Sequence, residues 1–260
     1  MMAHNILVFD IETVPDVDAG RRLLSLTGLS DAQVVEAMKL HRYSEAGTEF
    51  QRHHLHRIVA ISVVLRTAET LQVWSLGTAE SDEKALVQRF FEGVERFQPT
   101  LVSWNGSGFD LPVLHYRALL HGVEARTYWD TGHFDRERKW DNYISRYQFA
   151  HIDVMDVLSG YQPRAAAKLD EIAVMLGLPG KMGQSGAEVT EQWLAGEIEA
   201  IRNYCETDVV NTYLIYLQFE RMRGRLTESQ WRQLRRQMRD YLLNSGRAHL
   251  QAYAEAWHES

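Results

Sequence analysis

Three short segments place acidic side chains where they could bind a metal ion, and the first is Phe9-Asp10-Ile11-Glu12-Thr13. The apolar run 6–9 predicts a short buried strand. Because side chains alternate along a strand, Asp10 and Glu12 share one face at its C-terminal end. Carboxylates two residues apart offer oxygen ligands to one hard cation such as Mg²⁺. An isolated pair of this kind is equally typical of a solvated strand end.

The second segment, Ser103-Trp104-Asn105-Gly106-Ser107-Gly108-Phe109-Asp110, joins a predicted strand to a predicted helix. Its glycines favour a turn and let a substrate approach the backbone closely. Asp110 fits the N-cap of the helix, with Pro112 in the first turn. Capping does not prevent a carboxylate from contacting a metal or water, so both interpretations of Asp110 stay open.

The third segment is Tyr204-Cys205-Glu206-Thr207-Asp208, which lies within a predicted helix. Tyr204 and Asp208 are neighbours there because they are four residues apart. Asp208 is seven residues from both Ile201 and Ile215, which places it within the apolar stripe of the helix. A carboxylate in that position needs a buried arginine, a hydrogen-bond network or a metal ion to compensate its charge.

The elements around these segments follow a mixed order of strands and helices. An opening antiparallel meander and then alternating strands and helices predict an α/β fold, a mixed sheet flanked by helices that is compatible with an RNase H-like fold. We expect strands at 6–9, 58–65, 71–76 and 101–104, and helices at 82–97, 111–121, 168–176, 198–219 and 228–243.

Two segments interrupt this order. Residues 14–57 form an insertion, and the capping-box pattern Ser30-x-x-Gln33 predicts that it is helical and covers the sheet edge or the site. Residues 131–150 mix charges with aromatic side chains and predict a long loop. We therefore expect one domain over 1–220 and a C-terminal helical extension over 221–260 packed on it.

Composition excludes several classes of protein. The 260 residues include one cysteine, Cys205, so no internal disulfide forms and a cytoplasmic location is expected. No apolar run approaches the roughly 20 residues that span a bilayer, and no secretory signal is present. The net charge of −7, taken alone, argues weakly against nucleic-acid binding, which needs Lys and Arg for phosphate contacts. The distribution of charge matters more, and residues 221–239 hold seven arginines and one acid.

Taken together, the three segments resemble the motifs of the DEDD exonuclease superfamily in its tyrosine-bearing branch. The D-x-E, N-G-x-x-F-D-like and Y-x-x-x-D patterns occur in order, with Asp110 98 residues from both Glu12 and Asp208. The chain is most similar to the proofreading exonuclease domain of family B DNA polymerases and to related stand-alone bacterial exonucleases. The resemblance extends from about residue 5 to 220 and includes Lys168-Leu169 through Gly180-Lys181. No polymerase domain follows, so we expect no proofreading in cis.

This resemblance implies a 3′→5′ exonuclease that uses two divalent cations, Mg²⁺ or Mn²⁺. It implies that Asp10 bridges the two ions, that Glu12 and Asp208 complete the shell of the first, and that Asp110 holds the second. Tyr204 would position the attacking water. Two cations about 4 Å apart can generate the nucleophile and stabilise the leaving oxygen at phosphorus. The product would be a nucleoside 5′-monophosphate.

The expected partner is nucleic acid, as the 3′ end of single-stranded DNA. The alternatives are an exoribonuclease acting on RNA ends or short oligonucleotides, and a non-catalytic nucleic-acid-binding module on the same fold. Asn105 and Phe109 are candidate contacts to the terminal nucleotide. The alternative interpretation is that Asn105 only forms the turn and Phe109 only anchors the core. Lys181 is interpreted as a solvated loop lysine, although it could reach a phosphate.

Three further stretches have a functional and a structural interpretation. His151, Asp153 and Asp156 could bind a metal, but capping or solvation of the next segment is favoured. The basic run 52–57 could follow a nucleic-acid backbone, but a solvated approach to a strand is favoured. The arginine-rich helix after residue 221 has Trp231 on its apolar stripe and is predicted to dock on the domain, leaving arginines for DNA or a partner.

Overall fold

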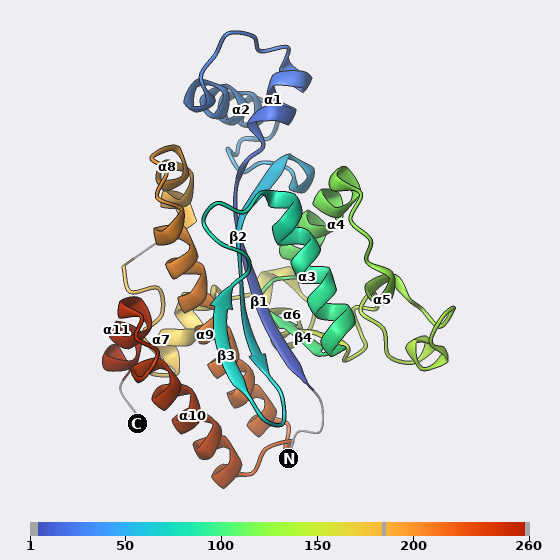
Figure 1. Ribbon diagram of the computed structural model, residues 1–260, viewed down its shortest axis with the longest axis vertical. Helices are drawn as coiled ribbons and strands as arrows, with labels where there is room; N and C mark the ends of the chain where they lie inside the picture. The colour runs from blue at the N-terminus through green and yellow to red at the C-terminus, as the bar shows by residue number, and fades with distance from the viewer. Residues whose placement is uncertain (1–4, 184–185, 258–260) are drawn as a thin grey trace.

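The computed structural model describes residues 5–183 and 186–257, and in this part of the chain one five-stranded sheet forms the centre of the molecule (Figure 1). The strand order is β3-β2-β1-β4-β5. The strands are β1 (Ile6–Pro15), β2 (His56–Arg66), β3 (Leu71–Ser75), β4 (Thr100–Ser103) and β5 (His151–Asp153).

The central strand β1 has a different partner on each side. It pairs antiparallel with β2 over its whole length and parallel with β4 over residues 6–8 only. β2 carries one extra residue, Val59, opposite the step from Glu12 to Thr13. This bulge bends the long β1–β2 ribbon as it leaves the sheet. The mixed sheet and its helices confirm the RNase H-like α/β fold expected from the sequence.

Helices cover both faces of the sheet. The helices are α1 (Val17–Leu24), α2 (Asp31–Ala46), α3 (Glu83–Phe97), α4 (Asp110–His121), α5 (Arg126–Trp129), α6 (Val154–Leu158), α7 (Leu169–Met175), α8 (Val189–Leu194), α9 (Ile198–Met222), α10 (Glu228–Leu243) and α11 (Ala248–Ala256). One hydrophobic core lies between the sheet and α9, and a second lies between the sheet and the pair α3 and α4. No helix of the described residues is both long and apolar enough to cross a membrane.

The predicted insertion is helical, as expected, but it stands away from the sheet (Figure 1). Ser30 and Gln33 form the capping box that begins α2. α1 and α2 pack on each other around a small core of Val17, Val34 and Met38. The expectation that the helices cover the sheet edge or the site is wrong, because their apolar faces satisfy each other. The segment after α2 returns towards the sheet.

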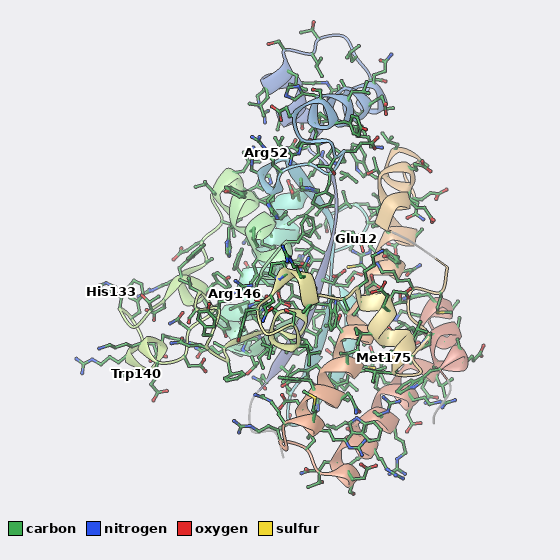
Figure 2. The ribbon with its side chains drawn as sticks, turned by 180° about the vertical axis from the view of Figure 1, so that it is seen from behind. Glu12, Arg52, His133, Trp140, Arg146 and Met175 are labelled. Carbon is green, nitrogen blue, oxygen red and sulfur yellow. The ribbon has the colours of Figure 1, made fainter. Side chains whose placement is uncertain are left out.

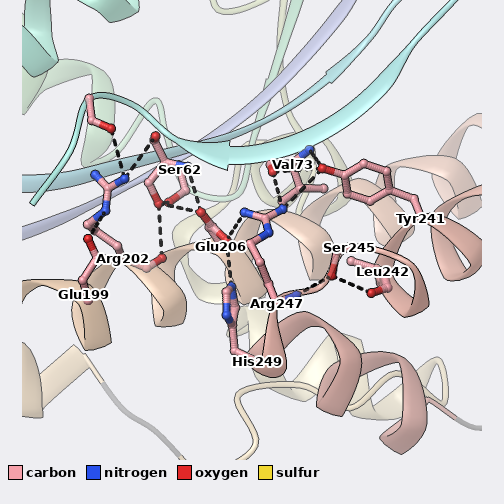
Figure 3. Close-up of polar contacts among 12 residues, drawn as sticks. Ser62, Val73, Glu199, Arg202, Glu206, Tyr241, Leu242, Ser245, Arg247 and His249 are labelled. Carbon is pink, nitrogen blue, oxygen red and sulfur yellow. Dashed lines mark hydrogen bonds and ion pairs between the residues drawn. The ribbon is translucent and has the colours of Figure 1, made fainter.

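α10 packs on the edge strand β3, and a buried carboxylate of α9, Glu206, links that strand to the start of α11 (Figure 3). Oε1 of Glu206 accepts hydrogen bonds from the backbone N–H of Ser75 (2.9 Å) and from its hydroxyl (3.0 Å). Oε2 accepts from Arg247 at 2.8 Å and from His249 at 2.7 Å. The phenol of Tyr241 bonds the backbone of β3, which closes part of the free strand edge.

Two of the sequence predictions need correction, and a third is confirmed. β1 continues to Pro15, so Asp10 and Glu12 lie inside the strand and not at its C-terminal end. The strand β5 was not predicted, because residues 151–153 are too few to show a periodicity. The loop before β5 is confirmed as irregular apart from a 3₁₀ turn at 136–139, and His133 and Trp140 lie at its outer tip (Figure 2).

Candidate active site

The alternation along β1 decides which way Asp10 and Glu12 point. Val8 belongs to the core beneath α9, whereas Leu7 and Phe9 belong to the core beneath α3 and α4. Asp10 and Glu12 continue the series of Val8 and therefore face α9. Figure 2 shows Glu12 near the middle of the molecule, beside the long helix.

Asp110 reaches the same region from the first turn of α4. β1 stops pairing with β4 after Val8, which leaves its next outward N–H groups without a strand partner. The N–H of Ile11 donates to Oδ1 of Asp110 at 3.2 Å. The N-cap position of α4 is occupied by Phe109, without a side-chain cap, so the N-cap interpretation of Asp110 is wrong. Its carboxylate is turned towards β1 because β1 offers an unpaired donor there.

Asp208 and Tyr204 lie on the face of α9 that packs on the sheet, and both are buried. Oδ1 of Asp208 has no hydrogen-bond partner among the described residues. Oδ2 lies 3.1 Å from Nζ of Lys181, whose ammonium also donates to the phenol oxygen of Tyr204. The charge of Asp208 is thus compensated by a lysine at Oδ2, and no described residue bonds Oδ1.

The loop after α7 delivers Lys181 to this position. Gly180 adopts a φ of +68°, and a Cβ there would lie 2.3 Å from Oδ1 of Asp170. That same oxygen accepts the backbone N–H of Lys181 at 2.8 Å, and Asn211 of α9 donates to the carbonyl of Gly180 at 3.0 Å. Lys181 is therefore held in the site, and its interpretation as a solvated loop residue is wrong. The Gly-Lys pair was the available signal, but its orientation depends on Asp170 and Asn211.

The acidic groups of the site raise one another's pKa values. Burial, and then repulsion from Asp110 and Glu12, raises the pKa of Asp10 well above its ordinary value. Burial and the charge of Asp208 raise the pKa of Glu12 in the same way. Burial raises the pKa of Asp110 to about 7. The positive charge of Lys181 opposes these shifts at Asp10 and Glu12 without cancelling them.

Tyr204 and Cys205 stay protonated in this environment. Burial, and then the charges of Asp208 and Glu12, raises the pKa of the Tyr204 phenol. Burial and the charge of Asp10 raise the pKa of the Cys205 thiol well above its usual range. Sγ of Cys205 lies 3.6 Å from Oδ2 of Asp10. Beside Asp10 and Glu12, the metal-free site therefore holds Cys205 as a neutral thiol.

Three of the candidate carboxylates meet at one open cavity of about 870 Å³. Asp10, Asp110 and Asp208 line it, as do Asn105 and Phe109. Glu12 lies in the layer beneath, where it is 8% exposed and interacts with Asp208 through its charge. The structure thus brings every residue of the three motifs to one place.

The second motif loop is shaped by Asp153 of β5. Oδ1 and Oδ2 of Asp153 accept the N–H groups of Asn105 and Ser107, each at 2.9 Å, and Asn105 has a φ of +64°. Asp153 also caps α6, and Asp156 is paired with Arg146. The capping interpretation is confirmed for Asp153, whereas Asp156 is buried and its charge is balanced by Arg146 instead of by solvent.

The end of the insertion, after α2, supports one wall of the cavity, so this part of the insertion does reach the site as the sequence predicts. Nε2–H of His53 donates to the carbonyl of Gly108 at 2.8 Å. The ring of Phe109 lies 5.5 Å from that of Phe50 and 5.0 Å from that of His56, centre to centre. The basic run before β2 is therefore not simply solvated. It supports one side of the cavity through Phe109.

Most of this chain matches one family of known proteins. A family model described as a predicted 3′-5′ exonuclease related to the exonuclease domain of PolB matches residues 48–257. The match spans more than half of the chain and contains Asp110, Tyr204 and Asp208, whereas Asp10 and Glu12 precede it. The chain belongs to this family. That membership confirms the 3′-5′ exonuclease expected from the motifs and its relation to family B DNA polymerases.

Polymerases are among the relatives of this family member. The catalytic subunit of DNA polymerase epsilon from Saccharomyces cerevisiae is 28% identical over 150 residues, which are 54% of this chain and 6% of that protein. A DNA polymerase from Archaeoglobus fulgidus is 26% identical over 142 residues, 52% of this chain and 17% of that protein. The chain thus spans less than a fifth of the length of these relatives. The solved family B DNA polymerase of Pyrobaculum calidifontis aligns with a TM-score of 0.49 at 20% identity, over 81% of this chain and 24% of that one.

Proposed function

We propose that this exonuclease removes nucleoside 5′-monophosphates from the 3′ end of single-stranded DNA, using two divalent cations, Mg²⁺ or Mn²⁺. The observation that carries the proposal is the meeting of Asp10, Asp110 and Asp208 at one open cavity. They come from a strand and two helices that are far apart in the sequence. DNA is proposed as the substrate because the relatives named above are DNA polymerases.

The donor set fits hard divalent cations. Carboxylate oxygens are the ligands that Mg²⁺ and Mn²⁺ prefer, and Oδ1 of Asp208 is buried without a partner among the described residues. The raised pKa values of Asp10 and Glu12 reflect an excess of negative charge that cations would relieve. Cations bound there supply an activated water and stabilise the charge on the leaving oxygen. Asp10, Glu12, Asp110 and Asp208 would hold them.

The neighbouring side chains would orient the reacting groups. The Tyr204 phenol, which stays protonated, can hold the attacking water through one of its hydrogen bonds. The Lys181 ammonium fixes the positions of Tyr204 and Asp208 and adds positive charge beside the reacting phosphate. Asn105 and Phe109 are proposed to contact the terminal nucleotide, because both line the cavity next to Asp110.

The test is digestion of end-labelled single-stranded DNA and RNA, side by side, with Mg²⁺, with Mn²⁺ and with EDTA. We expect DNA to be shortened stepwise from the 3′ end, with no digestion in EDTA. A blocked 3′ hydroxyl should slow the reaction, and a blocked 5′ end should not. Equal activity in EDTA would overturn the metal-dependent mechanism, and faster digestion of RNA would replace the proposed substrate.

Variants test the division of roles within the site. Asp10→Ala and Asp208→Ala should abolish digestion, because each removes a ligand at the centre of the cavity. Tyr204→Phe should leave measurable activity, since the phenol orients water and does not hold the cations. A Tyr204→Phe enzyme as inactive as Asp10→Ala would contradict this assignment of Tyr204.

A further inference from the structure

A second large groove of about 980 Å³ lies on the side of the molecule where α7, α9 and α10 meet. Its walls come from the end of α7, the end of α9 and the first half of α10. These three helices lie on the same side of the sheet (Figure 1). Met175, at the α7 wall, is 69% exposed and is labelled in Figure 2.

The groove is strongly basic, although the whole chain has a net charge of −7. Arg221, Arg232, Arg235 and Arg236 line it, and the acid among the lining residues is Glu228. Glu228 is shared between Arg221 and Arg232. Arg236 is exposed and forms no ion pair within residues 5–183 and 186–257. Positive charge is therefore left over on the exposed floor of the groove.

Two of the four guanidinium groups, those of Arg221 and Arg235, pack on one indole. Arg221 Cζ lies 4.4 Å from the centre of the Trp231 ring, and Arg235 Cζ lies 4.8 Å from it. Arg235 is buried and also packs 4.8 Å from the ring of Trp257. Ordered guanidinium groups recognise phosphate oxygens through paired hydrogen bonds. The groove thus has the chemistry of a phosphate-binding surface.

The groove and the active-site cavity are both lined by α7, from opposite ends of the helix. Residues 168–171 line the cavity that holds Asp208, and residues 174–177 line the groove. Along α9, Gln218 of the groove is ten residues beyond Asp208, which corresponds to about 15 Å of helix. A stacked strand advances about 3.4 Å per nucleotide, so this distance is covered by roughly five nucleotides.

We propose that this arginine groove binds the phosphate backbone of the same single strand whose 3′ end is in the active site, about five nucleotides upstream of the end. The inference rests on the proposed function. It gives the enzyme a second contact that short oligonucleotides cannot reach. The groove therefore sets a length requirement on the substrate and raises the affinity for longer strands.

The test compares the double variant Arg232→Gln/Arg236→Gln with the wild type on strands of three and of twelve nucleotides. For the wild type, KM should be lower on the twelve-nucleotide strand. The double variant should lose most of this advantage, with a KM increase of roughly tenfold on the long strand, as expected for two phosphate contacts. Its kcat and its KM on the short strand should not change.

The matched control is Arg89→Gln/Arg96→Gln, which removes two exposed arginines from α3 on the opposite face of the sheet. It should behave as the wild type on both strands. A plot of log KM against log salt concentration should also become less steep in the Arg232→Gln/Arg236→Gln variant alone. Its slope should fall by about 1.4, which corresponds to two lost phosphate contacts.

Several outcomes separate this inference from the proposed function. If the wild type digests neither strand, the proposed function fails, and a binding titration of the labelled twelve-nucleotide strand in EDTA still tests the groove. Weaker binding in the Arg232→Gln/Arg236→Gln variant than in the α3 control supports it. Equal KM values or equal binding for the two double variants would overturn the proposed contact between the groove and the strand. The groove would then be a surface for an acidic protein.

Discussion

The ammonium of Lys181 lies 3.1 Å from Oδ2 of Asp208, although the two residues come from different elements and are 27 positions apart. Although burial acts against it, the charge of Asp208 raises the pKa of Lys181, so the ammonium is ionised at neutral pH. This contact leaves the second carboxylate oxygen of Asp208 available to bind a cation. Lys181 therefore belongs to the site as much as the residues of the three motifs.

Replacing Lys181 with Met removes this charge and keeps most of the side-chain volume. We expect kcat to fall about a hundredfold, because one preorganised positive group beside the reacting phosphate is lost. Lys168→Met is the control, since Lys168 lines the same cavity without an ion pair to the carboxylates among the described residues. Single-turnover digestion measures both. An unchanged rate for Lys181→Met would show that Lys181 has a structural role beside Asp208 and does not contribute to catalysis.

Asp10→Asn should stabilise the metal-free protein. The raised pKa values of Asp10 and Glu12 mean that their ionised forms oppose folding at neutral pH, and the amide removes one charge at nearly the same volume. The variant should melt higher than the wild type in EDTA and gain less from Mn²⁺. At a metal concentration one hundred times the dissociation constant, metal binding stabilises the folded protein by about 2.7 kcal/mol. Lower melting of the variant in EDTA would show that hydrogen bonds of Asp10 outweigh the repulsion.

Buried histidines should make the protein lose stability in mild acid. Burial lowers the pKa of His151 from 6.5 to about 4, so the folded state binds this proton more weakly than the unfolded state. Its stabilising contribution is complete above pH 6.5 and is lost as the pH falls towards 4, by up to about 3 kcal/mol. Urea unfolding from about pH 7 to about 4.5 should be less pH-dependent in His151→Gln than in the wild type. Exposed His133→Gln, the control, should retain the wild-type dependence.

Glu206→Gln should loosen the attachment of the C-terminal helices. His249, Arg247 and Ser75 together hold the pKa of Glu206 below its ordinary value, against the effect of burial. The amide loses the charge-assisted bonds to Arg247 and His249, and we expect a cost of about 2 kcal/mol. Glu199→Gln on the same helix is the control, because Glu199 is exposed and its ion pair with Arg202 is weak. Equal denaturant midpoints for the two variants would rule out a stabilising role for this network.

Much of this protein can be predicted from the sequence because the information is local. Strand alternation fixes that Asp10 and Glu12 share a face, and the helical repeat fixes that Tyr204 and Asp208 are neighbours in the apolar stripe. The helix 228–243 and the capping box of Ser30 also depend on short-range patterns, and both are confirmed. The order of the three motifs indicates the exonuclease family without any coordinates.

The tertiary structure decides which of these local features meet. Lys181 approaches Asp208 only because Asp170 and Asn211 hold the loop around Gly180. No local pattern can specify this, since the partners lie 11 and 31 residues away from the atoms they bind. The turn of Asp110 towards β1, the support of Phe109 by the insertion and the arginine groove depend in the same way on contacts between distant segments. Sequence determines the chemistry each element carries, and packing determines which charges share one enclosed space and so what they can bind.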